Sequence, residues 1–301
     1  MKKGVGVIVL LALSILGVNS ALAQKQVKAS DMRQFRPREI KMDRNHDGKV
    51  DRIEIYDEKG MILRVEADST DDGNMNEWVY YKDGSPVKGE RDIDADGKAD
   101  VTLFYDNSGM IIKSETDTNK DGKPDEWVSY KKGIPTNAEK DVNKDGKPDT
   151  FLTYDKAGIV VKSGIDTNGD GVVDEWVYYK DGKPISGEKD VNKDGKSDTK
   201  LTYDKSGVVI KSETDTDGDG KTDEWVEYEG GIPASAEKDI NKDGKPDTFL
   251  TYDKAGIIIK SETDANKDGK IDEWVEYKNG NPVKAEKDTS GNGKPDTWVT
   301  Y

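Results

Sequence analysis

The chain has 301 residues, 62 Asp and Glu against 47 Lys and Arg, a formal net charge of −15, one His and no Cys. Without cysteine there is no disulfide framework, no thiol nucleophile and no iron–sulfur ligand set. The acidic balance argues against a nucleic-acid partner, which needs a basic face. With 36% charged and 32% hydrophobic residues, the composition alone is typical of a disordered chain.

The first 23 residues have the pattern of a secretory signal peptide. Lys2 and Lys3 precede the apolar stretch Val5–Val18, and Ala21–Ala23 forms a small-x-small cleavage site. The apolar stretch is too short for a membrane span, which takes roughly 20 residues. We therefore predict residues 1–23 to be a signal peptide, and the protein to be exported to the extracellular space, cell surface or periplasm without membrane insertion. The basic residues 24–42 are predicted to be a flexible lead-in.

Residues 43–301 are built from one repeated segment, Asp-x-Asn-x-Asp-Gly-x-x-Asp, with other oxygen-bearing residues at some of its positions. Eleven copies alternate at steps of 25 and 24 residues, which makes five and a half copies of a 49-residue unit. Such a fixed period is typical of repeat architectures. The copies of the first series begin at Asp43, Asp92, Asp141, Asp190, Asp239 and Asp288, and those of the second at Asp68, Asp117, Asp166, Asp215 and Asp264.

Each segment is followed by two short β-prone runs joined by a Gly turn. Examples of the first run are 150–154 and 126–130, and examples of the second are 257–262 and 282–286. This pattern predicts a β-hairpin. A Tyr stands 13 residues after every first Asp, from Tyr56 to Tyr301. Because side chains alternate along a strand, this Tyr and the Leu or Val two residues before it share a face, and the Trp or Phe three residues before it lies on the other. We predict the tyrosines to form the core.

The predicted fold is therefore all-β, with almost no helix after the signal peptide, because no stretch has apolar residues at helical spacing. We favour tandem β-hairpins in an elongated single-sheet or solenoid-like stack, with the Asp/Gly segments along one edge. A five- or six-bladed β-propeller is the alternative, since propeller blades have a similar length.

The repeated segment has the oxygen pattern of a calcium loop. In the copy at 141–149, Asp141, Asn143, Asp145 and Asp149 place oxygens at positions 1, 3, 5 and 9, and Gly146 allows a sharp turn. Ca²⁺ takes six to eight oxygens at ~2.3–2.6 Å in flexible geometry, whereas Mg²⁺ demands a tighter octahedron. All-oxygen ligation also disfavours metals that seek nitrogen or sulfur. We predict up to about eleven Ca²⁺ sites with coupled folding.

The predicted metal ligands are the residues at positions 1, 3, 5 and 9 of each copy, together with Glu54 at position 12 of the first. The complete set is Asp43, Asn45, Asp47, Asp51, Glu54, Asp68, Thr70, Asp72, Asn76, Asp92, Asp94, Asp96, Asp100, Asp117, Asn119, Asp121, Asp125, Asp141, Asn143, Asp145, Asp149, Asp166, Asn168, Asp170, Asp174, Asp190, Asn192, Asp194, Asp198, Asp215, Asp217, Asp219, Asp223, Asp239, Asn241, Asp243, Asp247, Asp264, Asn266, Asp268, Asp272, Asp288, Ser290, Asn292 and Asp296.

The copies differ in their number of carboxylates. Those beginning at Asp92 and Asp215 have four each and should bind best, whereas those at Asp68 and Asp288 are weaker. A Glu also stands two residues before most first aspartates, as Glu66 does before Asp68. It could add an outer-shell oxygen to the site or pair with a neighbouring Lys.

The segment resembles the calcium loops of EF-hands, dockerins, thrombospondin type 3 repeats and FG-GAP/VCBS-type β-propeller repeats. It departs from the EF-hand at position 12, where only Glu54 supplies the expected Glu, and flanking helices are missing. The propeller-type loop is the nearest local match, because it also closes with Asp at position 9 and joins two strands. The Tyr-x-x-Gly hairpins are similar to MORN-type repeats. The resemblance implies a calcium-binding loop.

These features predict a secreted structural or adhesive repeat protein whose folding and rigidity depend on Ca²⁺. A calcium-dependent binding platform and a calcium buffer are the alternatives. Catalysis is not expected, because an enzyme needs one unique desolvated constellation and here the acids recur in register. Expected partners beyond calcium are a cell-surface or matrix component, or a second copy paired through an edge strand.

Overall fold

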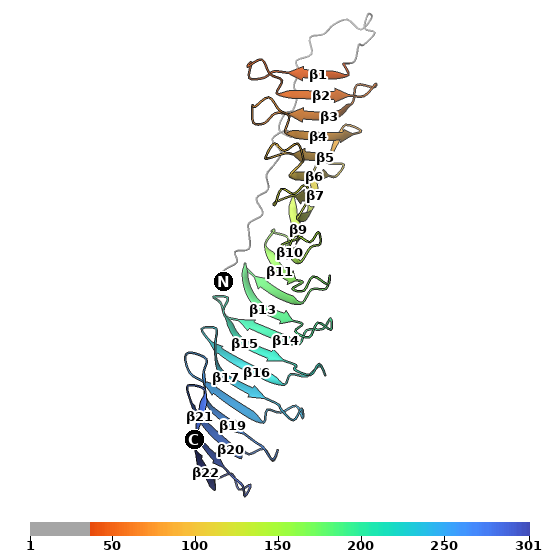
Figure 1. Ribbon diagram of the computed structural model, residues 1–301. Coiled ribbons are helices and arrows are strands. Elements are labelled where there is room, and N and C mark those ends of the chain that lie inside the picture. Colours follow the sequence, from red (N-terminus) through yellow and green to blue (C-terminus); the bar gives the residue numbers. More distant parts are fainter. Residues whose placement is uncertain (1–36) are drawn as a thin grey trace, which may run out of the picture. The chain divides into compact units, whose positions relative to one another are not determined.

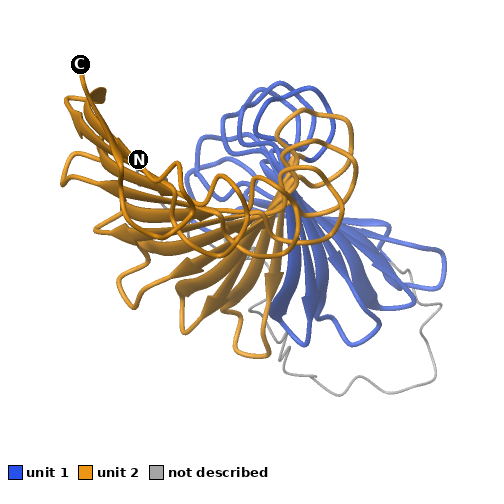
Figure 2. Ribbon diagram, turned by 90° about the horizontal axis from the view of Figure 1, so that it is seen from below, with its two compact units in different colours: residues 1–148 blue, residues 149–301 orange. Residues whose placement is uncertain are grey.

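The computed structural model describes residues 37–301. The predicted signal peptide and most of the predicted lead-in lie outside the described residues. The chain divides into two units, Met1–Pro148 and Asp149–Tyr301, which Figure 2 colours separately. Residues 37–301 contain 22 β-strands and no helix, as the sequence predicted. Accordingly, that part of the chain offers no helix long and apolar enough to cross a membrane.

Unit 1 contains nine strands within its described part. They are β1 (Glu39–Met42), β2 (Arg52–Tyr56), β3 (Ile62–Ala67), β4 (Glu77–Lys82), β5 (Ser85–Arg91), β6 (Val101–Tyr105), β7 (Ile111–Thr116), β8 (Glu126–Lys131) and β9 (Ile134–Lys140). Strand β1 pairs with β2 although its residues belong to the segment predicted as a flexible lead-in. The paired sheet thus begins at Glu39, four residues before the first Asp/Gly segment.

Unit 2 contains thirteen strands of the same alternating lengths. They are β10 (Thr150–Tyr154), β11 (Val160–Ile165), β12 (Glu175–Lys180), β13 (Lys183–Lys189), β14 (Thr199–Tyr203), β15 (Val209–Thr214), β16 (Glu224–Glu229), β17 (Ile232–Lys238), β18 (Thr248–Tyr252), β19 (Ile258–Thr263), β20 (Glu273–Lys278), β21 (Asn281–Lys287) and β22 (Thr297–Thr300).

Within each unit, every strand pairs antiparallel with the strand that follows it in the chain (Figure 1). In the described residues the pairing runs on without breaking into four-stranded blades, and the sheet is open and unclosed. The tandem-hairpin prediction is confirmed and the propeller alternative is wrong. Because connections alternate between the two edges of an antiparallel meander, the Asp/Gly loops share one edge of each unit's sheet and the turns share the other.

Two kinds of turn explain the alternating 25- and 24-residue steps. After β4, Asp83 and Gly84 both have positive φ, 51° and 82°, which is the type I′ geometry that suits a two-residue hairpin turn. After β6, Asp106 begins a longer turn, where its carbonyl accepts a bond from the Gly109 N–H at 2.9 Å and its carboxylate caps the N–H of Met110 at 3.0 Å. The longer turn adds one residue to its hairpin.

The core lies on the face of each sheet that carries the tyrosines, here named the tyrosine face. In unit 1, Tyr105 packs with Val101 and Leu103, and partly buried Ile111 covers them. In unit 2, the Tyr203 hydroxyl lies over Gly187, where a Cβ atom would come within 3.2 Å of it. Tyr130, Tyr179, Tyr228 and Tyr277 likewise reach a small residue on the preceding strand, a serine whose hydroxyl lies 3.2–3.3 Å from theirs. Of the eleven repeat tyrosines, Tyr105 and Tyr130 are buried and eight are half-buried, whereas Tyr301 is 70% exposed, so the predicted core role holds for all but the last.

The opposite face of each sheet, the tryptophan face, carries half-buried aromatic rings between rows of charged side chains. The Glu that precedes an Asp/Gly loop pairs there with a basic residue two positions earlier on its own strand, as Glu115 does with Lys113 at 2.7 Å. The same pairing occurs at Glu66, Glu90, Glu213, Glu262 and Glu286. Of the two roles left open by the sequence, these six glutamates take the ion-pair role.

Candidate metal-binding loops

Every Asp/Gly segment forms a nine-residue loop, whose positions are numbered from its first Asp. The loop begins directly after one strand and ends directly before the next. Position 6 is always Gly, with φ between 84° at Gly293 and 95° at Gly73, a region that other residues rarely adopt. The glycine therefore makes the sharp turn that the sequence predicted. The loop at 141–149 crosses the boundary between the two units, and each of its parts is described only within its own unit.

Backbone N–H groups hold the carboxylates at the two ends of each loop. In the loop at 190–198, the Asp190 carboxylate accepts bonds from the N–H groups of Lys193 at 2.7 Å and Gly195 at 2.8 Å. The Asp198 carboxylate accepts a bond from the N–H of Val191 at 2.7 Å. Side-chain oxygens at positions 3 and 5 accept bonds from the N–H groups two residues further on. These bonds hold each acid in place inside the loop.

The end positions are also the buried ones. The Asp174 side chain is 1% exposed and Asp190 is 2% exposed, whereas positions 3 and 5 are exposed in both of these loops. Burying a carboxylate is costly unless opposite charge or hydrogen bonds compensate it. Each loop has at least one buried acid at its base, although Asp296 is exposed, and this arrangement suits a cation.

In four loops, three carboxylate oxygens converge to within 4.8 Å of one another. Two ligands on opposite sides of a Ca²⁺ ion are separated by roughly 5 Å, because each Ca–O distance is about 2.3–2.6 Å. The converging oxygens are therefore near enough to share one ion. The four sets are Asp43, Asp47 and Asp51; Asp92, Asp94 and Asp96; Asp190, Asp194 and Asp198; and Asp215, Asp217 and Asp223.

Three further predicted ligands are placed as follows. Glu54 lies on β2, where its carboxylate pairs with Arg52 at 2.7 Å and accepts a bond from the Tyr56 hydroxyl at 2.5 Å. The hydroxyls of Thr70 and Ser290 each donate to the first Asp of their own loop, at 3.1 and 2.9 Å. Each hydroxyl oxygen thus lies within hydrogen-bond distance of the buried first carboxylate of its loop.

One set of loop residues was missed by the sequence reasoning. The hydroxyl at position 2 donates to the position-9 carboxylate, as between Thr118 and Asp125 at 2.6 Å and between Thr216 and Asp223 at 2.8 Å. The same bond occurs at Thr167 and Thr289. The available signal was that position 2 is Ser or Thr in four of the five second-series loops and aliphatic in most of the first series.

Neighbouring loops are joined at their bases by a backbone hydrogen bond, here named the foot bond. The N–H at position 1 of one loop donates to the carbonyl at position 9 of the preceding loop, as from Asp190 to Asp174 at 2.7 Å and from Asp215 to Asp198 at 2.8 Å. Within each unit, every consecutive pair of loop ends is connected this way. The two residues that meet are both predicted metal ligands, but of different loops.

The carboxylates of several loops are held ionised. Hydrogen bonds from Lys193 and Thr167 lower the pKa of Asp174 to about 2. Burial raises the pKa of Asp68, but bonds from the N–H groups of Gly73 and Thr70 outweigh it and the pKa falls below its usual value. At neutral pH these acids are charged, as ligation of a hard cation requires.

These lowered pKa values predict acid lability of the metal-free protein. A carboxylate with a lower pKa in the folded state stabilises the fold above its unfolded pKa of ~3.9, and that contribution is lost as pH falls toward the folded value. With Asp174 at about 2, we expect the unfolding temperature in chelator and high salt to be flat above about pH 5 and to fall progressively below about pH 4. Melting scans across this range check the prediction, and a rising melting temperature on acidification would contradict it.

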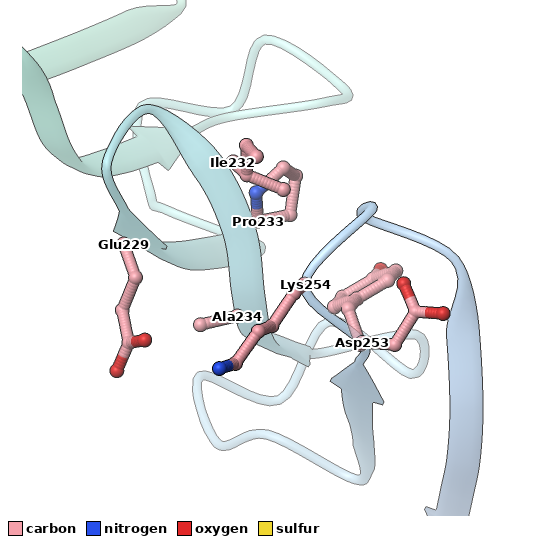
Figure 3. Close-up of a pocket in the computed structure, with 7 residues that line it drawn as sticks. Glu229, Ile232, Pro233, Ala234, Asp253 and Lys254 are labelled. Atoms are coloured by element: carbon pink, nitrogen blue, oxygen red, sulfur yellow. The ribbon is translucent and has the colours of Figure 1, made fainter.

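A separate hollow lies at the opposite edge of unit 2, among the turns (Figure 3). It has a volume of about 270 Å³ and is lined by residues at the ends of β16, β17 and β18 and in the turn that follows β18, including Glu229, Pro233, Tyr252 and Lys254. It contains none of the predicted metal ligands and is not part of the loop sites.

No protein-family model matches the chain, and no curated protein matches its sequence. Among solved structures it is similar to a mutant of S. aureus TarM in complex with Fondaparinux, alpha-GlcNAc-glycerol and UDP, with 12% identity and a TM-score of 0.28 over 39% of this chain and 22% of that one. It is also similar to the TcdB2-TccC3-Cdc42 structure, with 14% identity and a TM-score of 0.22 over 83% of this chain and 16% of that one. A porin-like protein from Bacteroides uniformis has 13% identity and a TM-score of 0.14, over 60% of this chain and 85% of that one.

The chain spans less than a quarter of the length of the first two of these structures. Likenesses this distant carry no argument about activity or partners.

Proposed function

We propose that this is an exported calcium-binding repeat protein with a structural or adhesive role, whose fold and rigidity depend on Ca²⁺. The observation that carries the proposal is the convergence of three carboxylate oxygens within 4.8 Å in four loops of one repeated design. The position-6 glycines and the buried acids at the loop ends support the same reading for the other loops. The regular succession of similar hairpins supports a structural rather than a catalytic role.

Calcium is favoured over other ions by the donor set. The loops offer carboxylate, amide, hydroxyl and backbone oxygens, which suit hard cations, and neither imidazole (apart from His46) nor thiolate is available in the sequence. A calcium buffer is a less suitable role, because a buffer needs a metal-free state that stays folded, whereas here buried acids rely on a counter-charge. Coupling of binding to folding favours the structural role.

Calorimetric titration of the protein with Ca²⁺ and with Mg²⁺ tests the proposal. We expect more than four Ca²⁺ ions per chain, up to eleven, with affinities of ~10⁻⁴–10⁻³ M, and weaker Mg²⁺ binding. Stoichiometry at or below one ion would sink the proposal, as would preference for Mg²⁺.

A triple substitution in one loop assigns the sites. Replacing Asp190, Asp194 and Asp198 together by Asn removes three converging oxygens and should lower the stoichiometry by one ion. The matched control is Asp204→Asn, because Asp204 lies in a turn at the opposite edge, where its carboxylate caps the N–H of Val208 at 3.0 Å. We expect the control to leave stoichiometry unchanged. An equal loss in both proteins would mean that the calcium is held only by net charge.

A further inference from the structure

Three loops already hold a cation, the ammonium group of a lysine from the next loop, and in two of them it lies at the loop base. Lys193 Nζ lies 2.6 Å from the carboxylate of Asp174 and 2.7 Å from the hydroxyl of Thr167, and both of these residues belong to the preceding loop. Lys242 Nζ lies 2.5 Å from Asp223 in the same way. These contacts bring positive charge to carboxylates that are predicted metal ligands.

Lys120 also contacts an acid of the preceding loop, but at position 3 rather than position 9. Its Nζ lies 3.0 Å from the Asp94 carboxylate, which belongs to the preceding loop at 92–100. All three lysines stand at position 4 of their own loop, where φ is close to 63° for each of them. Lys144 and Lys267 share position 4 and the left-handed backbone, with φ of 65° and 68°, but form no ion pair with the preceding loop among the described residues.

The glycines confirm the same juxtaposition where no lysine is present. A Cβ added at Gly218, which is position 4 of its loop, would lie 3.8 Å from the side-chain amide of Asn192 in the preceding loop. At Gly291 the corresponding distance to Asn266 is 4.0 Å. Position 4 of each of these loops therefore stands beside position 3 of the preceding loop, whatever residue occupies it.

We propose that the residue at position 4 of each loop sets the cation affinity of the preceding loop. A lysine there is a tethered cation that Ca²⁺ must displace into solvent, whereas glycine leaves the preceding loop open. This inference rests on the proposed calcium function and adds an order of filling to it. The loops at 190–198 and 264–272, which face Gly218 and Gly291, fill first. The loops at 166–174 and 215–223, which face Lys193 and Lys242, fill later.

This order reverses the one expected from counting carboxylates. The loop at 215–223 has four acids and was predicted to bind best, whereas the loop at 190–198 has three acids and an amide. The ammonium of Lys242 lies 3.7 Å from Asp217 as well as 2.5 Å from Asp223, so two of the four acids already have a counter-charge. The neighbouring residue, rather than the loop's own charge, then decides which loop fills first.

Nuclear magnetic resonance can follow each loop separately in a calcium titration of the ¹⁵N-labelled protein at high salt, as in the melting scans, because salt screens the acids of the metal-free protein. The N–H of the position-6 glycine donates to the first carboxylate of its own loop, as Gly171 does to Asp166 and Gly195 to Asp190, and therefore reports loading. We expect the Gly195 and Gly269 signals to reach their midpoints at lower calcium than those of Gly171 and Gly220.

The decisive variant is Lys193→Gly, because glycine is the native residue at position 4 of other loops. We expect the calcium concentration at the Gly171 midpoint to fall about tenfold, because the charge-assisted hydrogen bond from Lys193 no longer competes with Ca²⁺ for the Asp174 carboxylate. Lys193→Met should act in the same direction and Lys193→Arg should leave the midpoint in place. Lys205→Met is the matched control, because it removes one charge from a turn at the opposite edge. It should not move Gly171.

Two results overturn the inference, and they are distinguishable. In the first result, the glycine signals respond to calcium, but Lys193→Gly moves the Gly171 midpoint less than about threefold, or no more than Lys205→Met does. The lysine then has no such role, and the proposed calcium function stands. If none of the wild-type glycine signals responds to calcium, the proposed function fails and this inference fails with it. Circular dichroism verifies that each variant folds.

Discussion

Removal of calcium is expected to unfold most of the protein at low salt. Extracellular calcium modules bind at roughly 10⁻⁴–10⁻³ M, so at ~2 mM free Ca²⁺ an occupied loop with the tighter affinity adds about 1.8 kcal/mol to the folded state. Even four occupied loops would add about 7 kcal/mol, which is comparable to the whole stability of an ordinary domain. The core cannot replace this contribution, because its buried apolar side chains are few and mostly small.

The measurement is far-ultraviolet circular dichroism and thermal melting with calcium, with chelator, and with chelator followed by excess calcium. We expect the β spectrum to be lost in chelator and regained on adding calcium back. Chelator in high salt is the control for simple charge repulsion, because salt screens the acids without ligating to them. A melting temperature that is the same with and without calcium would refute calcium-dependent folding.

The Tyr105→Ala substitution is expected to have the largest effect of any single change in the core of unit 1. The Tyr105 side chain is 5% exposed and packs with Val101 and Leu103, so removing the ring leaves a cavity in a cluster with few members. Replacement of a buried aromatic side chain by Ala costs about 3–5 kcal/mol. Denaturant titration in saturating calcium measures the loss.

Substitution of the same ring by Phe separates packing from hydrogen bonding. The Tyr105 hydroxyl is buried without a hydrogen-bond partner among the described residues, and burial raises its pKa to about 12. Tyr105→Phe should therefore be neutral or stabilising by about 1 kcal/mol. Tyr130→Phe is the matched comparison, because the Tyr130 hydroxyl bonds Ser114 at 3.3 Å, and it should be destabilising. If Tyr105→Phe cost more than Tyr130→Phe, the assignment of the two hydroxyls would be wrong.

The features predicted correctly from sequence are those that depend on local chemistry. The run 150–154 becomes strand β10 with the same ends, because its β-prone residues are bounded by a loop and a turn. The Gly turns and the burial of most repeat tyrosines also follow from local rules, since turn residues and side-chain alternation are set within a few positions.

The features that were missed depend on which residues lie side by side across strands. The sequence places Lys193 in a calcium-type loop, but only the pairing of β13 and β14 with their neighbours brings its ammonium to Asp174. Strand β1 was missed because the residues around Glu39 are charged, and they pair only because β2 offers an edge. The filling order of the loops was likewise beyond reach, because counting acids within one loop leaves out the charge supplied by the next.

The foot bonds make the loops of each unit a linear chain of coupled elements. Ordering of one loop fixes the carbonyl at its position 9, and that carbonyl holds the first residue of the next loop. In such a one-dimensional array, each element is stabilised by its immediate neighbours alone. Damage to an inner loop therefore divides the run into two shorter segments, each with a new frayed end, whereas damage to a terminal loop only shortens it. The position of a defect then matters as much as its chemistry.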